Sequence, residues 1–211
     1  GYRESGFGRE GGREGMLSYL KPVSVKSGKA EPAPAALDAA VGLSTTADID
    51  RTAKLYIGGK QARPDSGYSY TVSGPKGPVG LAPLGSRKDI RNAVEAAAKA
   101  SGWGKATGHN RAQVLYYIGE NLSARASEFA DRLQSFGANK GTAQAELEAA
   151  IRRCFWYAAQ ADKFDGAVHS TQSRMVTLAM NEPLGVVGIA CPDRNPLLGF
   201  ISTVLPAIAT G

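Results

Sequence analysis

Apolar residues recur at helical spacing through most of the stretch from residue 86 to residue 161, and this pattern constrains the fold more than any other feature. The four apolar stripes run from Ile90 to Ala100, from Arg111 to Leu122, from Phe129 to Phe136 and from Leu147 to Ala161. Each stripe predicts an amphipathic helix with one buried face. Ser86 and Asp89 have the spacing of a capping box, Gly137 ends the third stripe, and Thr142 is the expected cap of the longest helix.

A β hairpin is expected before this helical section. Residues 55–57 form a short apolar run that ends at Gly58-Gly59, a dipeptide typical of a tight turn. A second turn signal follows at residues 64–67, which read Pro-Asp-Ser-Gly. Residues 68–73 come next, and we expect them to pair with residues 55–57.

Two strands and a helix are expected after the helical section. Residues 175–181 alternate between apolar and polar side chains, as a strand does. Residues 184–190 form a continuous apolar run that predicts a buried strand. Asn195 and Pro196 then begin the last helix, because proline is favoured in the first helical turn.

The composition is that of a soluble globular protein, with 43% hydrophobic and 21% charged residues. No apolar run approaches the roughly 18 residues that a membrane-spanning helix needs, so we expect no membrane partner. The net charge is +6, but the basic residues are scattered among acidic ones. Arg152-Arg153 is the tight basic pair without an adjacent acid, and no array of arginine and aromatic residues accompanies it, so we expect no nucleic-acid partner.

The cysteines and histidines do not have the spacing of a metal site. Cys154 and Cys191 lie far apart, and so do His109 and His169. This spacing argues against a disulfide framework and against zinc. A reducing, cytoplasmic location is therefore expected.

Residues at both ends of the chain carry motifs of one enzyme superfamily. The first ten residues read Gly-Tyr-Arg-Glu-Ser-Gly-Phe-Gly-Arg-Glu, which resembles the C-terminal signature of the aldehyde dehydrogenases. Residues 182–188 read Glu-Pro-Leu-Gly-Val-Val-Gly and resemble a strand from the first half of such an enzyme. The late motif therefore precedes the early one, an order that resembles the two-domain type of the superfamily, its family sixteen.

The resemblance implies a domain organisation and a fold. Residues 1–26 would be the tail of a preceding domain, 27–52 an Ala/Pro-rich linker, and 53–211 the front of a second domain. The implied fold class is α/β: an incomplete Rossmann-like parallel sheet flanked by helices, with an N-terminal β hairpin and oligomerisation strands. The strand at residues 21–26 would join another subunit's sheet, so a homo-oligomer is expected.

The resemblance also implies where a cofactor would bind. Family members hold NAD or NADP beside a Gly-x-x-x-Pro-Trp-Asn-x-Pro segment, and residues 188–196 match it at both prolines. The implied cofactor-binding residues are Ala190, Cys191, Pro192, Asp193 and Arg194. Arg194 occupies the position of the Asn that donates to the oxyanion, and Asn195 lies one residue too late. We therefore assign no catalytic residue in this chain.

Other candidate sites have simpler explanations. Cys191 and Cys154 are expected to be small buried side chains, because neither has a histidine nearby in the sequence. Residues 6–11 match Gly-x-Gly-x-x-Gly, but no strand precedes them. Trp103 and Trp156 are expected to anchor packing, with ligand stacking as the alternative.

The implied reaction is NAD(P)-dependent oxidation of an aldehyde to a carboxylic acid, with the second domain catalytically degenerate. The alternative is a non-catalytic scaffold or oligomerisation domain with the same fold. A third hypothesis is an unrelated small-molecule binding module, for which the end motifs would be coincidental. In each dehydrogenase-like case the chain alone is expected to be inactive. It is also expected to leave apolar faces exposed, and therefore to aggregate or to bind a hydrophobic dye.

Overall fold

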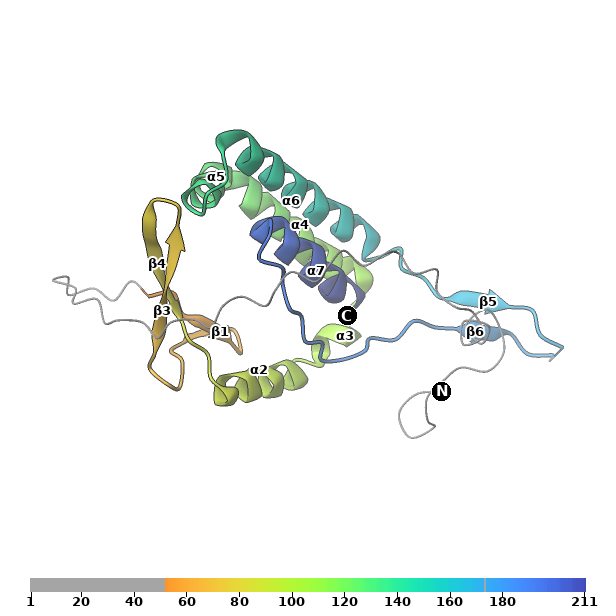
Figure 1. Cartoon of the computed structure of the whole chain (residues 1–211). Coiled ribbons are helices and arrows are strands. Elements are labelled where there is room, and N and C mark those ends of the chain that lie inside the picture. The colour runs from red at the N-terminus through yellow and green to blue at the C-terminus, as the bar shows by residue number, and fades with distance from the viewer. Residues whose placement is uncertain (1–51, 173) are drawn as a thin grey trace, which may run out of the picture. The chain divides into compact units, whose positions relative to one another are not determined.

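The computed structural model describes residues 52–172 and 174–211, which form six helices and three two-stranded sheets (Figure 1). The predicted tail at residues 1–26, with its strand at 21–26, lies outside the described residues. The predicted linker at 27–52 lies outside them as well, apart from its last residue. The fold described below is therefore that of the predicted second domain.

The first hairpin closes over a shorter distance than the sequence suggested. β1 (Leu55–Ile57) pairs antiparallel with β2 (Lys60–Ala62), so the prediction that residues 68–73 would be its partner is wrong. Gly58 and Gly59 have φ values of 61° and 77°, the two positive angles that a tight two-residue hairpin turn requires. The Gly-Gly turn therefore reverses the chain at once.

Residues 68–73 contribute to a second hairpin instead. β3 (Ser69–Gly74) pairs antiparallel with β4 (Gly77–Pro83), with an irregularity between Val72 and Ser73. The turn before β3 forms as predicted, since the N–H of Gly67 donates to the carbonyl of Pro64 at 2.9 Å. The front of the domain therefore contains two hairpins rather than one.

The four apolar stripes all form helices. The described helices are α2 (Arg87–Lys99), α3 (Gly102–Lys105), α4 (Gly108–Ala124), α5 (Ala126–Ser135), α6 (Lys140–Gln160) and α7 (Pro196–Thr210). The cap of α6 is Asn139 and not Thr142: the Asn139 side chain accepts the Thr142 N–H at 2.8 Å. None of these helices has the length and apolar character needed to cross a membrane.

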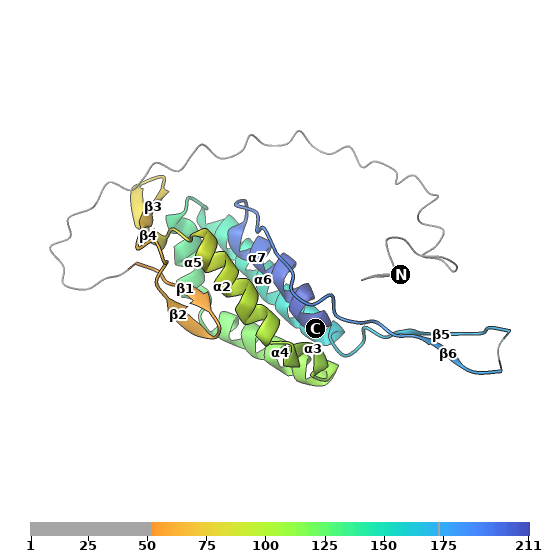
Figure 2. The same cartoon turned by 90° about the horizontal axis from the view of Figure 1, so that it is seen from below.

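A single core forms where α4, α5, α6 and α7 meet, and α4, α6 and α7 lie side by side in both views (Figures 1 and 2). Its largest fully buried side chains are Leu115, Leu147, Leu205 and Cys154. The apolar stripe of α2 behaves differently, because Ile90 is 66% exposed and Val94 is 49% exposed. The helical prediction is right for α2, but its stripe is not covered within the described residues.

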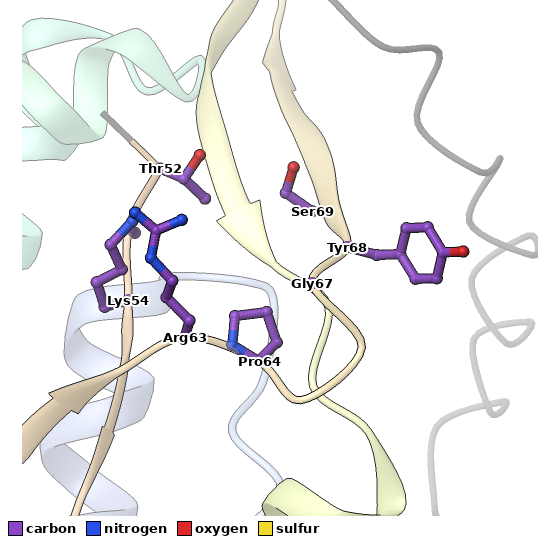
Figure 3. A pocket seen from close by; sticks show the side chains of 8 residues that line it. Thr52, Lys54, Arg63, Pro64, Gly67, Tyr68 and Ser69 are labelled. Atoms are coloured by element: carbon purple, nitrogen blue, oxygen red, sulfur yellow. The ribbon is translucent and has the colours of Figure 1, made fainter. Parts of the chain in front are cut away.

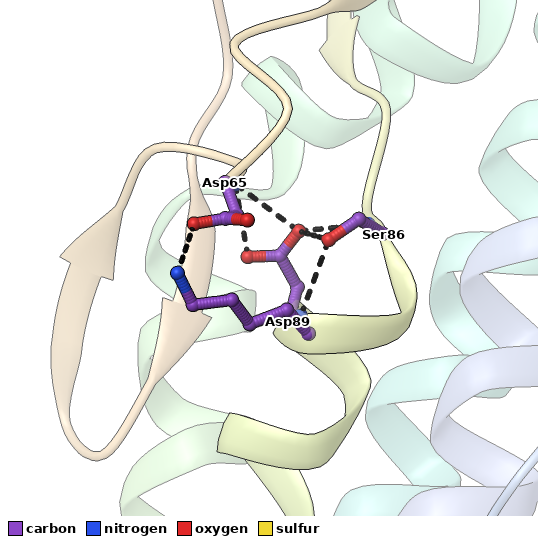
Figure 4. A network of polar contacts seen from close by, with 4 residues as sticks. Asp65, Ser86 and Asp89 are labelled. Carbon is purple, nitrogen blue, oxygen red and sulfur yellow. Dashed lines mark hydrogen bonds and ion pairs between the residues drawn. The ribbon is translucent and has the colours of Figure 1, made fainter.

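Helix α2 is tied to the turn before β3 by a polar network (Figure 4). Ser86 caps α2, and the predicted capping box with Asp89 is present. The Asp89 carboxylate accepts the Ser86 N–H at 2.7 Å and the Asp65 N–H at 3.1 Å. Lys88 adds an ion pair with Asp65 at 2.6 Å. The cap therefore joins α2 to the turn before β3.

The segment between α6 and α7 differs most from its prediction. β5 (Ala167–His169) and β6 (Thr177–Ala179) form an exposed hairpin, so the strand expected at 175–181 forms only at its centre. Residues 184–190 form no strand, and Leu184 is 93% exposed. A buried strand needs neighbours that satisfy its backbone groups, and the described part of the chain offers none to this segment.

All three described sheets are antiparallel pairs. The Rossmann-like parallel sheet therefore does not form among residues 52–172 and 174–211. The expected helices and the N-terminal hairpin do form. The mixed, incomplete α/β character implied by the sequence is thus seen in these elements.

Candidate functional site

The segment implied to contact a cofactor, residues 190–194, leads directly into α7. Within the part of the chain that the structure describes, the N–H and C=O groups of residues 190–194 form no hydrogen bond with other backbone groups. Asn195 then adopts a left-handed conformation with φ 50°, and its carbonyl accepts the Gly199 N–H at 2.7 Å. The chain therefore turns sharply at Asn195 and starts α7 at Pro196.

Pro192 holds this segment against the helix. A Cβ atom built on Gly199 would lie 2.5 Å from Cγ of Pro192, far inside van der Waals contact. Only glycine fits at residue 199 while Pro192 keeps this place. Pro192, one of the five implied cofactor residues, thus packs against α7.

A carboxylate from α6 caps the start of α7. Oε1 of Glu146 accepts the N–H of Leu197 at 3.0 Å and the N–H of Leu198 at 3.1 Å. These N–H groups have no partner inside the helix, and a negative charge there also opposes the positive end of the helix dipole. Glu146 was not singled out from the sequence, because it lies 51 residues before the group it caps.

The other end of α7 is held by two side chains from the helical section. Nε1 of Trp103 donates to the carbonyl of Ile208 at 2.9 Å, and Nε of Arg111 donates to the carbonyl of Ala209 at 2.9 Å. A cation at a helix C-terminus is the favourable sign. Trp103 therefore anchors the end of α7 through its indole N–H. Trp156 is 57% exposed, so the prediction that it anchors packing is wrong.

The side chains at the motif's altered positions extend into solvent. Asp193 and Arg194 are both exposed, and no hydrogen bond or ion pair within the described ranges holds either of them. Arg194 therefore has no second group that would fix its guanidinium at a defined point. A preorganised oxyanion donor requires such fixing.

The two cysteines differ, and one prediction about them is wrong. Cys154 lies in the core as expected, and burial raises the pKa of its thiol to about 11. Cys191 is exposed, with Sγ 3.7 Å from Oγ1 of Thr203, so it is not the buried side chain that was predicted. The reason is that the preceding apolar run is itself uncovered.

Residues 190–194 thus present an exposed surface, and no catalytic side chain is held in place among them. In the described ranges no three His, Cys, Asp or Glu side chains gather where they could hold a metal ion. The N–H groups that begin α7 are occupied by Glu146, so they offer no place for a phosphate.

A second concave region lies at the first hairpin (Figure 3). It encloses about 220 Å³ and is lined mainly by Thr52, Lys54, Arg63 and Pro64, together with Gly67 and Ser69. The Tyr68 ring points away from it (Figure 3). Among its described lining residues there is no histidine, cysteine or carboxylate.

Comparison with known proteins places these elements in a family. A model of the aldehyde dehydrogenase family matches residues 49–211. Betaine aldehyde dehydrogenase of Hordeum vulgare is 32% identical over 171 residues, which are 74% of this chain and 34% of that protein. Vanillin dehydrogenase of an Amycolatopsis strain is 33% identical and covers 64% of this chain and 28% of its own length.

Solved structures agree with the sequence matches. An NAD-dependent aldehyde dehydrogenase from Sinorhizobium meliloti superposes with a TM-score of 0.73 at 27% identity, over 77% of this chain and 34% of that one. A Burkholderia cenocepacia protein described as an aldehyde dehydrogenase gives 0.73 at 30% identity, over 75% of this chain and 35% of that one. The chain thus spans about a third of the length of its relatives.

Proposed function

Because this chain belongs to the aldehyde dehydrogenase family, we propose that it is part of an NAD(P)-dependent enzyme that oxidises an aldehyde to a carboxylic acid. The observation that carries the proposal is the family match over residues 49–211, which contain the helical section and the segment leading into α7. Relatives named for betaine aldehyde and vanillin support an aldehyde as substrate.

Within that enzyme we assign residues 190–194 a supporting role. A bound NAD or NADP would accept the hydride from the substrate. The exposed backbone of Ala190, Cys191 and Pro192 would form one wall of the nicotinamide cleft, and Asp193 and Arg194 would border it. The solvent-exposed Arg194 at the oxyanion position supports a catalytically degenerate domain.

The proposal includes the tandem order of the domains. The chain would comprise the tail of one dehydrogenase domain at 1–26, a linker at 27–52 and the front of a second domain at 53–211. Sequencing the coding region on both sides tests this. We expect a Gly-Gln-x-Cys nucleophile motif upstream and none downstream, whereas a downstream motif would mean a second working site.

The alternative function is a scaffold that pairs subunits. The exposed β5 and β6 strands favour it, because exposed strand edges can pair with another chain. In this proposal the protein is a homo-oligomer in the cytoplasm, where its thiols stay reduced. A single monomeric species in sedimentation of the complete gene product would contradict this alternative.

An activity assay tests the main proposal. The complete gene product, given betaine aldehyde, vanillin or acetaldehyde, is expected to reduce NAD⁺ or NADP⁺. The variant Arg194→Ala is expected to keep its rate within about twofold, as is the control Arg91→Ala on α2. A loss of about 100-fold in Arg194→Ala alone would instead make Arg194 an oxyanion donor.

A further inference from the structure

Helix α6 carries a basic and aromatic pocket that the proposed function does not use. From the sequence, no array of arginine and aromatic residues was expected at Arg152-Arg153, and the structure corrects this, because Trp156 and Tyr157 line the same pocket. The pocket has a volume of about 550 Å³ and is lined by Ala149, Arg152, Arg153, Trp156 and Tyr157. Ala149, the pair Arg152-Arg153 and the pair Trp156-Tyr157 follow one another at intervals of three or four positions, so they lie along one side of the helix. No acidic side chain is among the described residues that line it.

The aromatic end of this α6 pocket is ordered by its own contacts. The rings of Trp156 and Tyr157 meet edge to face, with centroids 5.0 Å apart and an interplanar angle of 79°. The Tyr157 hydroxyl donates to the Ser202 carbonyl of α7 at 3.4 Å, which directs this ring toward α7. Trp156 remains 57% exposed, so its face is open to a planar ligand.

The basic end has two guanidinium groups with little neutralisation. Arg152 lies 4.0 Å from Glu148 in an exposed pair, and Nη1 of Arg153 lies 3.5 Å from the Ser202 hydroxyl, which carries no charge. An exposed ion pair of this kind is weak. Among the described residues, the one carboxylate paired with either arginine is Glu148, at 4.0 Å from Arg152. The two arginines therefore keep enough positive charge to attract an anion, and the planar guanidinium matches a carboxylate best.

We propose that the α6 pocket binds a small carboxylate that carries a planar apolar ring. One helical turn of about 5.4 Å separates the arginines from Trp156, which suits a carboxylate attached directly to one ring. The carboxylate accepts hydrogen bonds from Arg152 and Arg153, and the ring stacks on the Trp156 indole. A nucleic acid would need a longer basic surface than one pair of arginines.

Benzoate is the probe that tests this site, and benzamide is its neutral isostere. Calorimetric titration of the chain is expected to show benzoate binding, and benzamide binding at least about tenfold weaker. Replacing both arginines, Arg152→Gln with Arg153→Gln, is expected to weaken benzoate binding at least about tenfold. Trp156→Ala is expected to weaken it as well, since the ring loses its stacking partner.

The control is Arg132→Gln, which removes an exposed arginine from α5 and is expected to leave the affinity unchanged. Far-UV circular dichroism checks that each variant keeps its helices, as expected for exposed side chains. Equal binding of benzamide and benzoate would overturn the proposal, and so would unchanged affinity in the double variant. Tighter binding of a short single-stranded oligonucleotide through the same arginines would replace it with a nucleic-acid surface. The titration measures binding alone, so its result does not depend on dehydrogenase activity.

Discussion

Asp89 shows how one side chain can join two elements of a small domain. Its carboxylate accepts the N–H and the hydroxyl of Ser86, at 2.7 Å and 2.8 Å, and the N–H of Asp65 at 3.1 Å. It is 5% exposed, so these donors replace water around the charge. The hydrogen bond from the Ser86 backbone is the main cause that lowers the pKa of Asp89 below its ordinary value.

This lowered pKa predicts an acid-sensitive cap. A carboxylate whose folded pKa is lower than its unfolded pKa stabilises the fold above the unfolded value, and that stability is lost as pH falls through the folded value. The urea concentration at the unfolding midpoint is therefore expected to decrease as the pH is lowered from about 5 to about 2. This decrease is expected to be smaller in the variant Asp89→Asn. The control Asp131→Asn, on the exposed face of α5, is expected to match the wild-type slope. An unchanged slope in Asp89→Asn would contradict the prediction.

The two cysteines predict a clear difference in thiol reactivity. Cys154 is fully buried, and its thiol has a pKa of about 11, whereas Cys191 is exposed. Because the thiolate is the reactive form, iodoacetamide at neutral pH is expected to modify Cys191 and leave Cys154 intact. Peptide mass spectrometry checks this, and both residues should react in urea. Rapid labelling of Cys154 in the native chain would mean that the α4 and α6 contact opens readily.

At the scale of elements, α7 is fixed at both ends by charges of the favourable sign. Glu146 caps its first N–H groups, and Arg111 and Trp103 bond its last carbonyls. Between these ends, Leu205 and its neighbours pack into the core. Residues 190–194 lead into α7, and Pro192 lies against Gly199 in its first turn, so the start of α7 is the part of the helix that contacts the candidate site.

The cap of α7 can be measured with a matched pair of variants. Glu146→Ala removes both hydrogen bonds and is expected to lower the free energy of unfolding by about 1 kcal/mol. Glu146→Gln keeps an acceptor oxygen but loses the charge, so a smaller decrease is expected. Glu148→Ala, two positions away and exposed, is the control and should have little effect. Equal stability of all three variants in urea titrations would show that the cap contributes nothing.

The sequence predicted elements well where the signal is local. The stripes of α4 and α6, the Ser86 cap of α2, the end at Gly137 and the start of α7 all depend on neighbours within a few residues. The predicted partner of residues 55–57 was wrong, because the Gly-Gly turn admits a closer strand.

The sequence could not predict contacts between residues that lie far apart in the chain. Glu146 meets α7 across 51 residues, and no local pattern marks that contact. The same limit applies to residues 184–190, whose apolar run predicts burial but cannot say which strands would cover it. Cys191, at the end of that run, is exposed for this reason.

At the scale of the whole described chain, apolar side chains divide into two groups. One group fills the core between α4, α5, α6 and α7. The other stays exposed, and it includes side chains on α2, on β5 and β6, and along residues 184–189. Monomeric soluble proteins rarely leave large contiguous apolar patches exposed. The second group is therefore where the chain would gain most from a covering surface.

Exposure of these faces predicts that the 211-residue chain binds a hydrophobic dye. Nile red is the suitable probe, because it is neutral and the arginine pair on α6 adds no attraction. Its emission is expected to rise on mixing with the native chain, since Ile90 is 66% exposed and Leu184 is 93% exposed. Replacing Ile90 and Val94 by Gln should lower the emission while helicity is kept, and Lys99→Gln on the same helix should not. A monomer that melts cooperatively and leaves the dye emission unchanged would show that these faces are covered in solution, and the scaffold alternative would lose its physical basis.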